Sequence, residues 1–220
     1  MSSEDLELRR KAVAELGREM RALVETVSRT ETPTEVLEEL AGEVKRLEAR
    51  FTGRRRERAE IPEVDVFPFG LRMYSPAAGH GSPIAPPMDI EETDKDGMVG
   101  RCVLGVVHEG PPGYAHGGLS AMLLDELMGW ACAAKGLPAM TIGLDVRYRR
   151  PVPVETPLLL KARVTGVEGR KITVAGSVCP ELDPETILVA AEGRFVAPDL
   201  DRARSLFPKA GTYSTFTDPD

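Results

Sequence analysis

The sequence is poor in the residues that characterise several common classes of protein. Its 3 cysteines, Cys102, Cys132 and Cys179, lie far apart and form no CxxC pair, which argues against a disulfide framework. The 3 histidines show no HxxxH spacing, so no zinc site is expected. No stretch approaches the roughly 18 consecutive apolar residues of a membrane span, and the N-terminus lacks the apolar core of a signal peptide. We therefore expect a cytoplasmic protein with no metal and no membrane span.

The chain is also short of positive charge. Its 28 lysines and arginines stand against 35 aspartates and glutamates, which gives a net charge of -7 and a pI near 5.2. Binding to nucleic acid needs a positive field over a broad surface. Nucleic acid is therefore not expected as a partner, and an anionic substrate would need a local basic patch.

The 220 residues can form one core domain with an appendage. Residues 1–60 hold two apolar stripes at helical spacing, which predict an N-terminal helical hairpin or extension. A connection rich in proline and glycine follows at 61–83, and a connection of this length is often functional. The core domain is expected at 84–198 and a C-terminal tail at 199–220.

The core domain combines strands with one helix. Its β-rich segments, separated by turn signals, are residues 98–108, 141–150, 157–167, 171–179 and 186–197, with an edge strand within 84–91 despite its prolines. Between the first of these strands and the rest lies a helix, 118–135, which is apolar nearly all round and therefore buried on most sides. Short connections favour antiparallel pairing. The prediction is an α+β fold in which a single antiparallel sheet curls around a central helix.

The central helix carries an acid pair, Asp125 and Glu126, without a helical partner of opposite charge. A buried carboxylate is costly unless paired, so these acids either mark a site or lie at a subunit seam or toward solvent. Gly117 and Gly118 precede the helix, where the first N–H groups lack intrahelical acceptors and the helix dipole is positive. Without Cβ atoms they allow close approach of a ligand, so this end of the helix is predicted to bind substrate as an oxyanion hole.

The spacing of these groups predicts a dimer. Asp125 is seven residues beyond Gly118, or roughly 10 Å at about 1.5 Å per residue. One carbonyl cannot lie about 3 Å from the donors and also about 3 Å from Asp125 of the same chain. Two antiparallel helices across a twofold axis would place each helix start beside the other chain's acid. A homodimer is therefore expected, and pairing of dimers into a tetramer is left open.

The segment Pro111-Pro112-Gly113-Tyr114-Ala115-His116-Gly117-Gly118, with Asp125 nine positions after the histidine, resembles the HGG-type hotdog-fold acyl-CoA thioesterases. This group contains phenylacetyl-CoA thioesterase-like and THEM4-like enzymes, and the resemblance covers roughly residues 84–198. It implies a hotdog fold and hydrolysis of acyl-CoA. It further implies that Asp125 acts as general base or nucleophile while the Gly117 N–H of the other subunit polarises the thioester carbonyl.

The resemblance also suggests roles for residues around this pair. Thr141 matches a hydroxyl residue that positions water in relatives, although it could equally be an ordinary strand threonine. His116 would order the loop or approach the substrate carbonyl, or simply pack in the loop. Gly110 stands near a position where some relatives carry an asparagine or glutamine that holds the lytic water, so Asp125 is expected to work with fewer helpers.

The phosphates of CoA would need cations, and Arg147, Arg149 and Arg150 lie near the end of the strand after the helix. Alternation places Arg147 and Arg149 on one face and Arg150 on the other, and a solvated outer face of the sheet is the competing interpretation for each. No cofactor is required, since CoA is part of the substrate. The alternatives to a thioesterase are a dehydratase or hydratase, for which no second motif is found, and a non-catalytic acyl-CoA-binding protein or dimeric scaffold. The acyl group is left open.

Overall fold

The structure is a computed structural model that describes residues 2–67, 70–93 and 97–208. Its centre is a six-stranded sheet with the strand order β1-β2-β4-β5-β6-β3. The strands are β1 (Asp89–Thr93), β2 (Gly97–Val103), β3 (Met140–Tyr148), β4 (Pro157–Glu168), β5 (Lys171–Pro180) and β6 (Val189–Val196). Every neighbouring pair is antiparallel. The single antiparallel sheet predicted from the short connections is confirmed.

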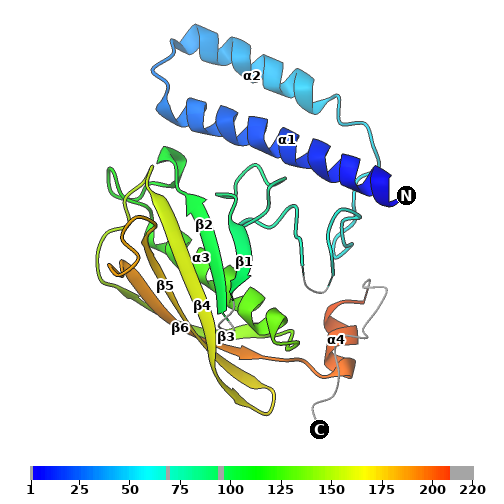
Figure 1. The fold of residues 1–220 in the computed structure, drawn as a ribbon. Helices are drawn as coiled ribbons and strands as arrows, with labels where there is room; N and C mark the ends of the chain where they lie inside the picture. Colours follow the sequence, from blue (N-terminus) through cyan, green and yellow to red (C-terminus); the bar gives the residue numbers. More distant parts are fainter. Residues whose placement is uncertain (1, 68–69, 94–96, 209–220) are drawn as a thin grey trace.

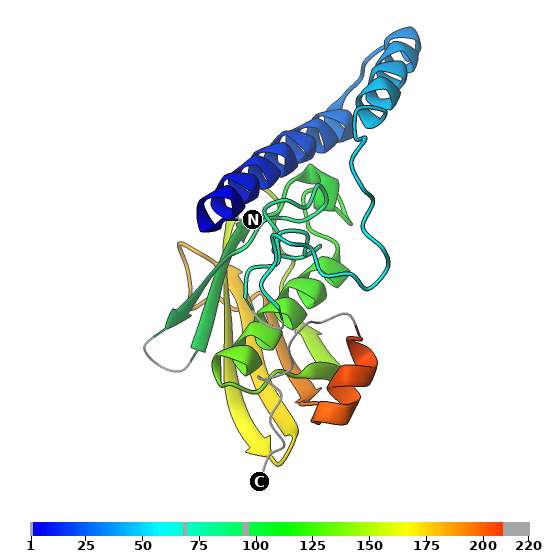
Figure 2. The same cartoon turned by 90° about the vertical axis from the view of Figure 1, so that its right-hand side faces the viewer.

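The sheet curls around one helix, α3 (Gly117–Ala134), as Figures 1 and 2 show from two sides. Leu123, Leu124, Leu127 and Met128 recur at helical spacing and are 0–1% exposed. They pack into the core with inward side chains of the strands, among them Leu158, Leu160, Ile172, Val174, Val189 and Phe195. Burial of such side chains contributes about 1.5–3 kcal/mol each. The predicted central helix is confirmed and begins one residue earlier than expected.

Three elements differ from the sequence prediction. β2 ends at Val103, and the last part of the predicted strand 98–108 forms a short 3-10 helix, η1 (Val106–His108). β1 occupies Asp89–Thr93 and not 84–91, because Pro86 and Pro87 have no N–H groups for the ladder. The predicted tail begins with a helix, α4 (Leu200–Leu206), while its residues 209–220 lie outside the described residues.

The N-terminal extension consists of α1 (Ser3–Arg29) and α2 (Thr34–Glu48), which confirms two helices there. α1 lies across one end of the core, and α2 projects beyond it (Figure 2). In α2 no residue is buried, so the residues that the structure describes leave the apolar stripe of α2 largely uncovered. The connection runs between α1 and the core, and its Val64, Met73 and Ala77 are 1–3% exposed. The connection has no helix or strand in its described residues, as predicted, but it is packed.

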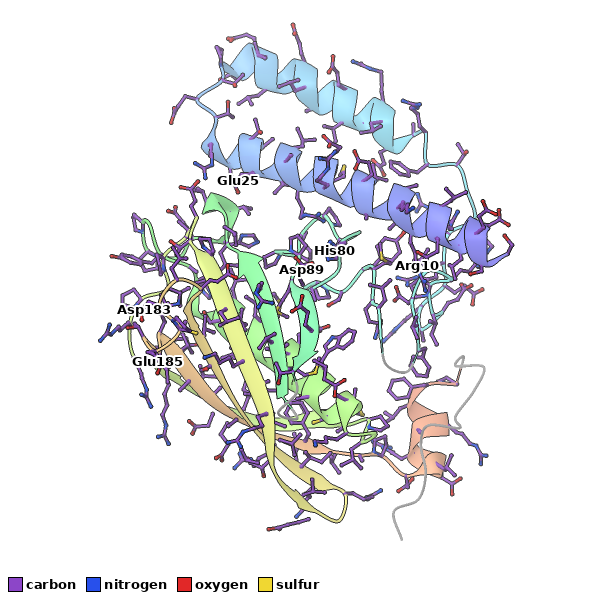
Figure 3. The ribbon with its side chains drawn as sticks, viewed as in Figure 1. Arg10, Glu25, His80, Asp89, Asp183 and Glu185 are labelled. Atoms are coloured by element: carbon purple, nitrogen blue, oxygen red, sulfur yellow. The ribbon has the colours of Figure 1, made fainter. Side chains whose placement is uncertain are left out.

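Polar groups and a glycine attach α1 to the connection, and Val13 of its apolar stripe lies against Gly81. Arg10 Nε donates to Val64 O at 2.9 Å, and Arg21 Nη1 donates to the carbonyls of His80 and Ser82 at 2.7 Å each. Figure 3 shows Arg10 and Glu25 toward opposite ends of α1. Gly17 lies between them along the helix, and a Cβ there would overlap the His80 carbonyl oxygen. The close approach at Gly17 explains a glycine in the middle of a long helix.

Candidate functional site

The central feature of the site is a hydrogen bond between the central helix and the edge strand β3. Thr141 Oγ1 donates to Asp125 Oδ1 at 2.7 Å. Asp125 lies half-buried on the side of α3 opposite the packed leucines, and Thr141 is exposed. The register between β3 and β6 shifts between Thr141 and Gly143. A bulge of this kind redirects neighbouring side chains and is common beside active sites.

Asp125 and Thr141 line a pocket of about 430 Å³. We call it the acid pocket; it is lined by Gly70, Arg72, Asp125, Glu126, Gly129, Trp130, Ala133, Ala139, Met140, Thr141 and Phe195. Gly129 and Ala133 lie one and two turns beyond Asp125 on the same face of α3, so the pocket follows the helix away from the acid. Its size and apolar lining suit an organic group more than a lone ion.

Glu126 has a different environment from its neighbour. Trp130 Nε1 donates to Glu126 Oε1 at 3.3 Å, along one turn of α3. Glu126 therefore satisfies the indole N–H of a half-buried tryptophan, and Asp125 is the acid that contacts a hydroxyl on another element. The two carboxylates line the same pocket but have separate partners.

At the start of α3, His116 caps the helix. Its Nδ1 accepts the N–H of Gly118 at 3.1 Å, and its carbonyl accepts the N–H of Leu119 at 3.0 Å. The N–H of Gly117 meets no acceptor among the residues that the structure describes. Of the two glycines proposed to face substrate, Gly117 is thus the one with a donor still available.

Both glycines also lie close to side chains of the same chain. A Cβ on Gly117 would lie 3.2 Å from the ring of Tyr148, whose hydroxyl donates to Gly117 O at 3.0 Å. A Cβ on Gly118 would lie 3.2 Å from the capping nitrogen of His116. The sequence analysis explained these glycines by ligand access alone. It missed Tyr148, an exposed aromatic side chain at the end of a predicted strand.

A residue of the N-terminal extension binds the loop before α3 through hydrogen bonds. Glu25 of α1 accepts the N–H groups of Val106 and Val107 at 3.0 and 3.2 Å, and Arg29 donates to the same carboxylate at 2.7 Å. Burial opposes ionisation of Glu25, but these hydrogen bonds outweigh it and hold the pKa of Glu25 below its usual value. Glu25 therefore fixes the position of η1 as a charged group.

η1 in turn contacts the capping histidine. The N–H of His116 donates to His108 O at 2.9 Å, and His108 Nδ1 accepts the N–H of Gly105 at 3.0 Å. Burial lowers the pKa of His108, although the Glu25 carboxylate and backbone groups act in the opposite direction. Gly110, also in this loop, is closely packed, since a Cβ there would lie 3.0 Å from His116 Cα.

The three arginines proposed for CoA are not arranged as strand alternation predicted. β3 ends at Tyr148, and the N–H groups of Arg149 and Arg150 both donate to Leu188 O, at 2.9 and 3.0 Å. Both line a pocket of about 310 Å³ that also includes Gly117, which we call the glycine pocket. Arg147 is not part of it and pairs with Asp145 at 3.4 Å. The alternation argument fails because the strand stops before Arg149.

The acid pocket and the glycine pocket have no lining residue in common. Gly117 and Asp125 are eight residues apart on α3, which corresponds to about 12 Å. A single chain therefore does not bring the acid and the backbone donor to one substrate atom. Among the described residues, no group of three or more His, Cys, Asp or Glu side chains could hold a metal ion, and no helix there is long and apolar enough to cross a membrane.

Comparison with known proteins gives this arrangement a family. The thioesterase superfamily profile matches residues 112–186, from the loop before α3 to the turn after β5. A solved structure of a thioesterase superfamily protein is 31% identical, with a TM-score of 0.72, and the match covers 84% of this chain and 94% of that one. The chain belongs to the thioesterase superfamily. Its sheet around α3 is the hotdog fold that the sequence resemblance implied.

Curated members of the thioesterase superfamily match over a shorter range. Acyl-coenzyme A thioesterase THEM4 of Mus musculus is 29% identical over 94 residues, which are 43% of this chain and 40% of that protein. Acyl-coenzyme A thioesterase THEM5 of Homo sapiens is 27% identical over 93 residues, 42% of this chain and 37% of that protein. The chain thus spans about 40% of the length of the curated relatives that it matches.

Proposed function

We propose that this protein hydrolyses acyl-CoA thioesters to a carboxylic acid and CoA, and that it does so as a homodimer. The observation that carries the proposal is the Asp125–Thr141 hydrogen bond in the lining of a pocket suited to an organic group. The curated relatives named acyl-CoA thioesterases support the same chemistry. A carboxylate held by a hydroxyl, with open space beside it, can act as a base toward a bound water or as a nucleophile.

The dimer would complete the site by joining the two pockets. β3, which carries Thr141, is an end strand of the sheet, so one of its edges is free to pair with a second copy. Met140, Ile142 and Tyr148 of this strand are 40–58% exposed, as expected of a face that another chain covers. A twofold axis beside β3 would set the Gly117 N–H of one protomer opposite Asp125 of its partner.

In the proposed reaction the thioester carbonyl oxygen accepts the Gly117 N–H of one protomer. Asp125 of the other removes a proton from water, a C–O bond forms as the hydroxide attacks the carbonyl carbon, and the C–S bond breaks. The thiolate leaves and takes up a proton to give CoA. Direct attack by Asp125, followed by hydrolysis of the mixed anhydride, gives the same products. Because a thiolate is a good leaving group, carbonyl polarisation and one base are sufficient, with no metal or redox cofactor.

The two ends of the substrate would occupy different pockets. Arg149 and Arg150 beside Gly117 provide guanidinium groups for the CoA phosphates. Arg147, paired with Asp145, is a weaker choice for this role. The acyl group would then extend along α3 in the acid pocket, past Gly129 toward Ala133.

The first test is release of CoA thiol from short, medium, long and aryl acyl-CoAs by the wild type, Asp125→Asn and Glu126→Gln. Loss of a general base costs about 100-fold or more in rate, so Asp125→Asn should lose activity while remaining folded. Glu126→Gln is the matched control, because it neutralises the neighbouring acid in the same pocket, and it should stay active. An active Asp125→Asn would refute the assigned role. CoA binding without turnover by the wild type would instead favour the non-catalytic acyl-CoA-binding protein.

The shared site is tested by mixing two inactive variants. Gly117→Pro removes the proposed N–H donor at the first position of α3, where proline is tolerated and where His116 already has an extended backbone. A heterodimer with Asp125→Asn would contain one intact site. Random exchange of equal amounts should therefore restore about a quarter of wild-type activity, since half of the dimers are mixed and each has one of two sites. No restoration after verified exchange would show that each site lies within one chain.

A further inference from the structure

Arg72 is a pocket residue that the sequence analysis did not single out. It lies in the connection, outside the residues that the superfamily profile matches, yet it lines the acid pocket together with Asp125 and Thr141. Gly70 of the same connection also lines this pocket. The N-terminal part of the chain therefore contributes one wall of the space beside the proposed catalytic acid.

The Asp65 carboxylate holds the guanidinium of Arg72 in place. Its Nε donates to Asp65 Oδ2 at 3.0 Å, and Asp65 Oδ1 accepts the N–H of Met73 at 2.8 Å. The Asp65 side chain is 2% exposed, whereas that of Arg72 is 48% exposed. A buried carboxylate with both oxygens engaged fixes the guanidinium through Nε alone, which leaves Nη1 and Nη2 as oriented donors.

These two nitrogens have no acceptor among residues 2–67, 70–93 and 97–208. Each acid that shares the pocket has a donor on one oxygen, because Thr141 donates to Asp125 and Trp130 donates to Glu126, while Arg72 pairs with Asp65. The remaining surface, from Gly129 to Ala133, offers no side-chain acceptor. The acid pocket thus has an apolar floor along α3 and one set of unmatched donors.

We propose that Arg72 binds an oxygen atom of the acyl group, so that the preferred substrates are acyl-CoAs with a neutral oxygen, carbonyl or hydroxyl, on the acyl chain. The proposal rests on the proposed thioesterase function and names the substrate class for that site. A charged carboxylate on the acyl chain is disfavoured. Asp65 already neutralises Arg72, and Asp125 and Glu126 add two negative charges to the pocket lining.

The test compares acyl-CoAs matched in length that carry an unsubstituted chain, a keto oxygen on the penultimate carbon, or a terminal carboxylate. A hydrogen bond from a charged donor corresponds to about a 10-fold to 100-fold effect. The wild type should therefore favour the keto compound over the unsubstituted one by about 10-fold or more in kcat/KM at the length that fits the pocket. The carboxylate compound should be the poorest of the three.

Three variants separate recognition from folding. Arg72→Met removes the donors and should abolish the keto preference, because kcat/KM for the keto compound should fall by about 10-fold or more relative to that for the unsubstituted chain. Arg72→Lys keeps a positive partner for Asp65 but loses the forked donors, so it should fold like the wild type in thermal melts and still lose the preference. Arg18→Met removes another exposed, ion-paired arginine that does not line the pocket, and it should retain the preference.

The outcomes distinguish the two proposals. If the wild type hydrolyses unsubstituted chains but shows no keto preference at any length, or if Arg72→Met keeps that preference, the assignment of Arg72 is overturned and the thioesterase activity stands. If the carboxylate compound is the best substrate, the charge argument is wrong. If the wild type releases no CoA from any compound, the proposed function itself fails.

Discussion

Replacing Glu25 by glutamine tests whether the N-terminal helix positions the substrate loop. Glu25 lies on α1, while the amides that it binds, Val106 and Val107, precede the proposed oxyanion donor by about ten residues. Glutamine has the same length and shape, but it has one acceptor oxygen and an NH₂ group. One of the two backbone N–H groups would therefore face a donor, and the charge that pairs with Arg29 would be lost.

The expected loss of stability follows from these contacts. A hydrogen bond to a charged group contributes about 1.5–3 kcal/mol, and leaving a donor unsatisfied costs about 1–3 kcal/mol. The side chain of Glu25 is 28% exposed, and Val107 is exposed while Val106 is half-buried. Partial access to water favours the lower part of both ranges, so Glu25→Gln should destabilise the protein by about 1–2 kcal/mol at pH 7. Glu19→Gln, on the exposed side of α1, should change stability by less than about 0.5 kcal/mol.

The effect should depend on pH in a defined direction. The pKa of Glu25 in the folded protein lies below its usual value, because hydrogen bonds from Arg29 and the two amides outweigh the opposing effect of burial. The stabilisation is therefore fully present above the pKa of an unperturbed glutamate, about 4.3, and is lost as the pH falls through the folded pKa. The difference in unfolding free energy between wild type and Glu25→Gln should shrink as the solution is acidified.

Denaturant unfolding measures this difference, and hydrogen exchange of a peptide containing residues 104–110 locates it. Exchange should be faster in Glu25→Gln, and kcat should fall because η1 contacts His116 through His108 O. The reasoning would be refuted if Glu25→Gln matched the wild type in both stability and exchange at pH 7. A change in stability without faster exchange at η1 would mean that Glu25 acts elsewhere on α1.

Two glycine substitutions give opposite expectations. Gly17→Ala should destabilise the protein by about 1–3 kcal/mol in denaturant unfolding, because the new Cβ would overlap the His80 carbonyl. Gly42→Ala on α2, where the Cβ would lie 3.6 Å from Arg46 Nη1, should instead stabilise the protein by up to about 1 kcal/mol. Equal effects of the two substitutions would contradict the close packing of Gly17 against His80. Gly129→Leu should leave the fold intact, since a Cβ there meets no described atom within 4 Å, but it should lower kcat/KM for long acyl-CoAs more than for short ones. A uniform decrease over all chain lengths would argue against an acyl group in this pocket.

The elements that the sequence predicted well are those whose pattern is local. The central helix was recognisable because apolar residues fill all its faces and Gly136 and Pro138 follow it. The strands from β3 to β6 alternate and are separated by turn signals, so their positions were predicted to within a few residues. Asp125 stood out because an acid is unusual in such a helix. Its hydrogen bond to Thr141 depends on the β3–β6 register, and the family resemblance suggested Thr141 only as a residue that positions water.

The failures share a different cause. Val106 and Val107 have strand-forming side chains, but their N–H groups bind Glu25, which is more than eighty residues away in the sequence. Strand alternation was extended to Arg149 although β3 had already ended. Arg72 carried no signal at all, since the Asp65–Arg72 contact depends on the path of a connection without periodicity. In each case a specific contact decides the structure, and local propensity does not encode that contact.

The contacts of α1 relate the two halves of the proposed site to each other. Near its N-terminus, Arg10 binds Val64 O, the residue next to the aspartate that orients Arg72. Fifteen residues later, about 22 Å along the helix, Glu25 binds η1 and so the loop that ends at His116. A helix is stiff over this length, so α1 fixes the wall of the acid pocket and the loop of the glycine pocket to the same rigid element. The proposed dimer pairs the acid pocket of one protomer with the glycine pocket of its partner. The contacts of α1 within each chain would therefore fix the relative positions of the two active sites.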